Sequence, residues 1–142
     1  MGTHATPMGF RVGAVVALLW NLLGLVMFWK EMTLTPATVA ALPAAQQPIH
    51  AAMPSWVYGF FAIAVFAGLA GAVGLLLARR WAVPLMLLSF LGVTLQMASA
   101  YATTPVWALT GAAGVLPPLV LVVACLLLWL FARYARGRGW LR

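Results

Sequence analysis

The side chains that could do chemistry in this sequence are amides and hydroxyls set within long apolar runs. One run carries Leu85, Ser89, Gly92, Gln96 and Ser99 at alternating spacings of four and three residues. Residues with this spacing project along one stripe of a helix. A second stripe, in the first apolar run, contains Ala14, Ala17, Asn21 and Gly24.

Amides inside hydrocarbon need hydrogen-bond partners, because lipid tails offer none. Counted from the ends of its apolar run, Ser89 lies nearest in depth to Asn21. Gln96 lies about 7 Å closer to the outer surface, at a helical rise of about 1.5 Å per residue. We therefore expect the first and third runs to touch along a polar seam.

The seam consists of Trp20, Asn21, Ser89, Gln96 and Ser99, and two interpretations of it stay open. Polar side chains between packed spans commonly join helices by hydrogen bonds. Alternatively, Trp20, Asn21, Ser89 and Gln96 line a small cavity that opens toward the outer loops. An aromatic ring beside amide groups suits a neutral polar solute such as a sugar.

Other reactive arrangements are missing from the sequence. The four apolar runs contain no Asp, Glu, Lys, Arg or His, which argues against a proton relay or an ion-coupled exporter. Cys125 is the only cysteine, and we expect it to pack as a small apolar side chain. His4 and His50 fall on opposite sides of the membrane and cannot share a metal or haem. We expect no enzyme activity, no catalytic residue, no cofactor and no metal site.

The elements that carry these residues are membrane spans. Of 142 residues, 65% are hydrophobic and 6% are charged, whereas soluble domains have about 25% charged residues. A helical span needs about 20 apolar residues. We expect a single all-α membrane domain over residues 1–142, an antiparallel bundle of four transmembrane helices at about 12–29, 56–78, 81–101 and 112–132.

Charge placement predicts the orientation of the bundle. Eight Lys and Arg stand against one acid, Glu31, and the formal net charge is +7. Seven of the eight cations fall on one side of alternating spans, while Lys30 lies on the other side. By the positive-inside rule, both termini are cytoplasmic. The cations flank spans and form no separate basic domain, so we expect lipid as a partner and no nucleic acid.

Two connections and two prolines refine the prediction. Thr35 followed by Pro36 is typical of a helix start, so a short helix over residues 37–42 is expected to lie along the membrane face in the first outer loop. A second helical turn within 44–53 is made doubtful by Pro48. Pro117 and Pro118 fit a fourth helix that begins near Leu116 after an irregular entry, with a kinked helix as the alternative.

Small residues mark close helix contacts. The residues expected to allow such contacts are Gly24, Gly68, Gly71, Gly74 and Gly92. Small residues spaced by four let helix backbones approach in membranes. This spacing of small residues predicts close helix contacts either within the bundle or between copies of the chain.

Several short motifs are shared with one family. They are LLWNLLG at Leu18–Gly24, Leu42-Pro43, Pro54-Ser55-Trp56, RRWAVPL at Arg79–Leu85, Gln96-Met97 and RGWL at Arg138–Leu141. On these motifs, which extend over nearly the whole chain, the sequence resembles a family of small four-span bacterial inner-membrane proteins that often carry the label sugar transporter. The resemblance implies a bacterial inner membrane, and it supplies no catalytic or binding residue to transfer.

Two functional hypotheses follow from the sequence. The first is a non-enzymatic accessory or scaffold subunit that acts through helix packing, with other membrane subunits or further copies of itself as partners. The alternative is a transporter of a small, neutral, sugar-like solute. Because four helices enclose little space, that transporter is expected to act as an oligomer.

Overall fold

Four long apolar helices make up most of the protein. The computed structural model describes residues 5–142, so His4 lies outside the described part. The long helices are α1 (Met8–Met32), α4 (Ser55–Leu76), α5 (Ala82–Thr103) and α7 (Leu116–Gly137). Each is long and apolar enough to cross a membrane, so the described residues form the four long apolar helices that were predicted, and these are compatible with a four-helix membrane bundle. Their ends lie within five residues of the predicted boundaries.

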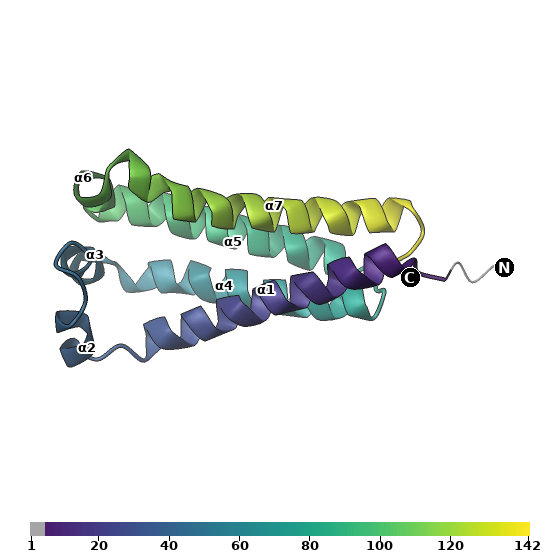
Figure 1. Ribbon diagram of the computed structural model, residues 1–142, viewed down its shortest axis with the longest axis horizontal. Helices are drawn as coiled ribbons and strands as arrows, with labels where there is room; N and C mark the ends of the chain where they lie inside the picture. Colours follow the sequence, from purple (N-terminus) through teal and green to yellow (C-terminus); the bar gives the residue numbers. More distant parts are fainter. Residues whose placement is uncertain (1–4) are drawn as a thin grey trace.

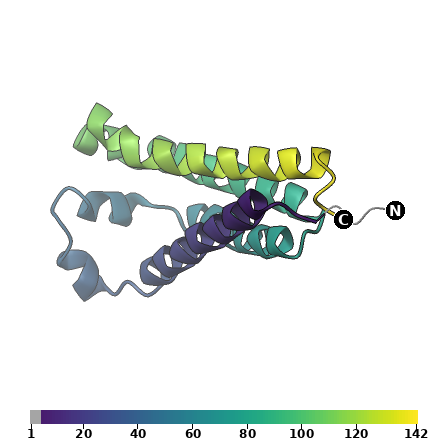
Figure 2. The ribbon, with the colours of Figure 1, turned by 45° about the vertical axis from the view of Figure 1, so that its right-hand side comes forward.

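The four helices pack in the order α1, α4, α5, α7, each mainly against its neighbours in this row. Neighbouring helices in this row run in opposite directions (Figure 1). At one end, α1 and α7 meet through Phe10 and Phe131, whose ring centroids lie 5.8 Å apart. Toward the other end, α1 and α7 diverge (Figure 2). The bundle is therefore closed at one end and open between its two outer helices.

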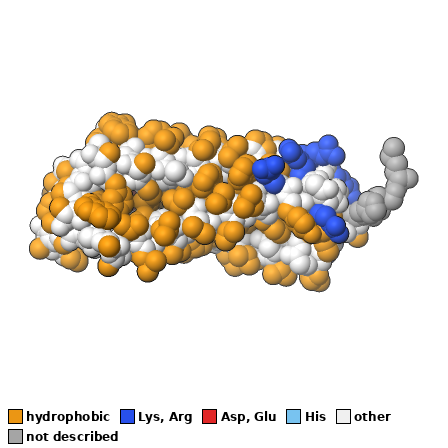
Figure 3. Space-filling model, turned by 90° about the horizontal axis from the view of Figure 1, so that it is seen from above, with side chains coloured by type: hydrophobic (Ala, Val, Ile, Leu, Met, Phe, Trp, Pro, Cys, Tyr) orange, Lys and Arg blue, Asp and Glu red, His pale blue; other side chains and the backbone are white. Residues whose placement is uncertain are grey.

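The closed end carries the arginines. Arginine side chains gather there on the face seen in Figure 3, whereas Lys30, the single lysine, lies at the other end of α1. The tight turn between α4 and α5 contains Arg79 and Arg80, as predicted. The Arg79 amide donates to the Gly74 carbonyl (2.8 Å), and Ala78 adopts a left-handed conformation with φ 52°. This is the hydrogen bond of a Schellman cap, which closes the end of α4.

The C-terminal residues complete this end by packing against the same turn. The Arg142 amide donates to the Ala78 carbonyl (2.7 Å), and the Arg80 amide donates to the Arg142 carbonyl (2.9 Å). Leu141 is buried, and the Trp140 ring lies 5.7 Å from that of Phe10. The segment after α7 therefore ties α1, α7 and the α4–α5 turn together.

The opposite end holds the short helices α2 (Pro36–Ala40), α3 (Gln47–Ala52) and α6 (Val106–Thr110). The expected short helix is present as α2, where the Thr35 hydroxyl accepts a hydrogen bond from the Thr38 amide (3.2 Å). The doubtful turn is also helical, because Pro48 stands in the first turn of α3, where its missing N–H costs little. Their position along a membrane face stays a prediction.

The start of α7 follows the first of the two expected arrangements. A short 3-10 helix, η1 (Ala112–Val115), forms the irregular entry, and α7 begins at Leu116 with its two prolines in the first turn. Gly111 precedes this entry with φ 61° and ψ −159°, a backbone conformation that essentially only glycine adopts.

Candidate functional site

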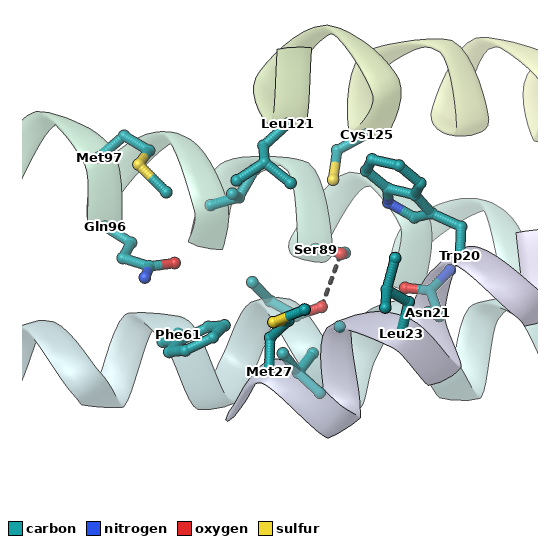
Figure 4. Close-up of a pocket in the computed structure, with 14 residues that line it drawn as sticks. Trp20, Asn21, Leu23, Met27, Phe61, Ser89, Gln96, Met97, Leu121 and Cys125 are labelled. Carbon is teal, nitrogen blue, oxygen red and sulfur yellow. Dashed lines mark hydrogen bonds between the residues drawn. The ribbon is translucent and has the colours of Figure 1, made fainter. Parts of the chain in front are cut away.

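A cavity of about 280 Å³ lies between the four helices at the middle of their length. It contains four of the five predicted seam residues, Trp20 and Asn21 from α1 and Ser89 and Gln96 from α5 (Figure 4). Ser99 lies farther along α5, is half-buried, and is not part of the lining. The remaining lining residues are Leu23, Gly24, Met27, Phe61, Ala64, Val65, Val93, Met97, Leu121 and Cys125.

Gly68 of α4 forms the meeting point of the two polar stripes. A Cβ atom at Gly68 would collide with Asn21 Oδ1 and lie 2.8 Å from Ser89 Oγ. Both polar side chains are buried, with exposed fractions of 6% for Asn21 and 4% for Ser89. Only a residue without a side chain at position 68 lets the two approach at this depth.

This arrangement corrects the expected contact between the first and third spans. The main neighbour of α1 is α4, and α5 also packs on α4. Asn21 and Ser89 therefore meet at the surface of the intervening helix α4, at Gly68. The helices α1 and α5 do not form one of the principal helix interfaces. The depth matching of these two residues was right, but the sequence did not indicate that Gly68 lies between them.

Hydrogen bonds within the protein occupy one amide hydrogen of Asn21 and the hydroxyl hydrogen of Ser89. The Asn21 amide nitrogen donates to the Ala17 carbonyl one turn earlier (2.7 Å). The Ser89 hydroxyl donates to the Ala64 carbonyl across the α4–α5 interface (2.6 Å). Asn21 Oδ1 receives no hydrogen bond from residues 5–142, and the Ser89 oxygen retains accepting capacity.

Gln96 adds an unsatisfied acceptor nearer the open end. Its Oε1 atom is buried and has no hydrogen-bond partner among the residues that the structure describes. The Gln96 amide points into the space that Phe61 and Leu121 also line (Figure 4). A buried acceptor without a partner costs about 1–3 kcal/mol, so a donor supplied from outside the chain is favoured here.

The cavity opens sideways between α1 and α7. Leu23 and Met27, both from α1, line it while remaining 50% and 49% exposed. Leu121 of α7 borders it from the opposite side and is 38% exposed. This opening corrects the expectation of a mouth directed at the outer loops, because the half-exposed rim consists of mid-helix apolar side chains.

The predicted small-residue contacts lie inside the chain. A Cβ at Gly92 would come within 3.0 Å of the Ala64 amide nitrogen, and one at Gly71 would meet the Met86 side chain at 3.2 Å. Gly74 faces Trp81, and Gly24 has Val65 at an ordinary contact distance of 3.9 Å. These glycines therefore join α4 to α5 and α1 to α4.

Sequence reasoning missed two further groupings. Cys125 was expected only to fill space, but it lines the cavity together with Trp20 and Ser89. At the open end, His50 Nδ1 lies 3.1 Å from Glu31 Oε1, and the Tyr58 hydroxyl donates to the same oxygen (3.5 Å). A carboxylate and an imidazole at the two ends of the first outer loop were a usable signal for this contact, whereas nothing in the sequence placed Tyr58 beside them.

No match was found for this chain among known protein families, curated proteins or solved structures.

Proposed function

We propose that this protein is a non-enzymatic accessory or scaffold subunit of a bacterial inner membrane, with both termini in the cytoplasm, that acts through helix packing. The observation that supports this role best is the open packing of α7. Its fully buried residues are Ala132 and Ala135, both close to the basic end. Along the rest of the helix, side chains such as Leu119 and Leu127 remain exposed (51% and 59%).

Helix association in lipid depends on van der Waals packing and hydrogen bonds, because lipid tails are as apolar as leucine. A helix with one long-range neighbour along most of its length retains a face for a second helix. Three glycines of α4, Gly68, Gly71 and Gly74, already make contacts within the chain. A partner subunit, or a second copy, is therefore proposed to pack on the outer faces of α7 and α1.

Photocrosslinking in native membranes tests this proposal. A photoreactive amino acid at Leu127 should yield one adduct of discrete mass, from a second copy or from a stoichiometric partner. The same amino acid at Phe61, whose side chain faces the cavity, serves as a control for general reactivity. Lipid adducts alone at Leu127 would exclude a scaffold role through α7.

The cavity supports a second candidate, transport of a small neutral solute. It places an indole ring, two amides and a hydroxyl around one space in the middle of the bundle. Labelled glucose uptake into reconstituted vesicles would measure this activity. Trp20→Ala and Gln96→Leu should abolish the uptake if the cavity is the path, and an unchanged uptake would remove the cavity from consideration.

A further inference from the structure

We infer that the cavity between α1 and α7 is a binding site for a neutral molecule that has an apolar body and a hydroxyl group, taken up laterally from the bilayer. This inference goes beyond the proposed functions, since binding requires neither a partner subunit nor movement of solute across the membrane. It rests on the hydrogen-bonding capacity of the lining and on the position of the opening.

Within residues 5–142, the buried side-chain polar atom that lacks a hydrogen-bond partner is an acceptor. Asn21 donates one of its two amide hydrogens to Ala17, and Ser89 donates its single hydroxyl hydrogen to Ala64. Gln96 Oε1 is buried and unpartnered within residues 5–142. Three oxygens of the lining therefore have accepting capacity to offer a ligand. A hydroxyl group can donate to Gln96 Oε1 and also accept from the remaining amide N–H groups of Asn21 and Gln96, whereas an ether or a ketone can only accept.

The charge and chemistry of the lining residues limit the class of ligand further. No Asp, Glu, Lys, Arg or His is among the lining residues, so nothing there compensates a charged ligand. Most of the lining is aliphatic, aromatic or thioether, including Met27, Phe61 and Met97. A sugar would leave most of its hydroxyls without partners against these side chains. One hydroxyl on an apolar body matches the few polar groups present.

Size and access agree with such a molecule. An apolar cavity of about 150 Å³ is large enough to bind benzene, so a cavity of about 280 Å³ has room for a molecule of roughly ten heavy atoms. The half-exposed rim residues Leu23 and Met27 let a longer apolar tail pass between α1 and α7 into the surrounding lipid. Fatty alcohols and isoprenoid alcohols belong to this chemical class.

Cys125 provides a native reporter of occupancy, because it lines the cavity and is the only cysteine of the chain. The full-length protein in phosphatidylcholine nanodiscs would be alkylated with N-ethylmaleimide and followed by mass spectrometry. The probes are n-octanol and heptyl methyl ether, which have equal numbers of heavy atoms but differ in the donor. They would be compared at equal mole fractions in the bilayer.

We expect octanol to slow the alkylation of Cys125 at about tenfold lower concentration than the ether does, which is the factor for one net hydrogen bond. Gln96→Leu should reduce this difference. A cysteine at Leu127, in a Cys125→Ala background, faces away from the cavity and controls for effects of the alcohol on the bilayer and the reagent. That cysteine should react at the same rate with either probe.

Three outcomes would overturn the inference. Equal protection by alcohol and ether would show an apolar void without recognition. Equal slowing at Leu127→Cys would assign the effect to the bilayer. An absence of protection at Cys125 would show that the cavity does not take up the alcohol. The comparison of octanol with heptyl methyl ether at Cys125 uses the unaltered protein. Its result is therefore valid even where a variant fails to fold.

Discussion

Substitution of Gly68 by alanine is the sharpest test of the polar meeting point in the bundle. The new methyl group would collide with Asn21 Oδ1 and lie 2.8 Å from Ser89 Oγ. Overpacking in a filled interior costs about 1–3 kcal/mol. Displacement of the Ser89 hydroxyl from the Ala64 carbonyl would destabilise the folded protein by about 1 kcal/mol more. The higher helix propensity of alanine would offset up to about 1 kcal/mol of this loss.

Gly59 supplies the matched control, because it lies in the same helix and a Cβ there meets nothing within 4 Å. Gly59→Ala should leave the free energy of unfolding unchanged or raise it by up to about 1 kcal/mol. The two variants should therefore differ by about 2–4 kcal/mol. Reversible unfolding in mixed micelles with increasing dodecyl sulfate, followed by circular dichroism, measures this difference.

A double-mutant cycle identifies the cause. Asn21→Ala removes the amide that the new methyl group would meet, so it should be less harmful in the Gly68→Ala background than in the native one, by about 1–2 kcal/mol. If Gly68→Ala and Gly59→Ala unfold within about 0.5 kcal/mol of each other, the convergence of α1 and α5 over Gly68 is wrong.

Three other predictions use the ends of the bundle. Ala78→Gly should raise the free energy of unfolding by about 1 kcal/mol, because glycine adopts φ 52° without a Cβ penalty; the same mixed-micelle unfolding measures it, and a loss of stability would contradict the strain. Glu31→Gln should weaken the contact between residue 31 and His50 and increase amide exchange in α3 while changing global stability by about 1 kcal/mol or less; unaltered exchange would show that this contact does not hold α3. A reporter fused after Arg142 should be active only in the cytoplasm, and a cysteine at Gln46 should be labelled only from outside; the reverse pattern would overturn the proposed orientation.

Local signals were sufficient for most of the secondary structure. Long apolar runs separated by arginines located the spans, and the proline at position 117 located the start of α7 within its first turn. Thr35 and Pro36 together marked the start of α2. These features depend on residues close in sequence, where capping and proline geometry act directly.

The order of the helices could not be read in the same way. The spans α1 and α4 are apolar on nearly every side, so their sequences do not reveal which face turns toward which neighbour. Small residues occur around α4 at Gly68, Gly71 and Gly74. Several faces of α4 therefore looked equally suited to a close contact, and its position between α1 and α5 was missed.

The cavity arises from unequal packing along α1. Near the basic end, Phe10 stacks on Phe131 and Ala14 is buried, which holds α1 close to both α4 and α7. Beyond Asn21 the buried stripe of α1 ends, and Leu23 and Met27 are half-exposed. Large aromatic side chains thus close one end, while the divergence of α1 from α7 leaves the amides of the middle accessible from the side. In a hydrocarbon environment that supplies no hydrogen bonds, this geometry leaves the accepting oxygens of Asn21 and Gln96 available to a hydroxyl that enters between the two outer helices.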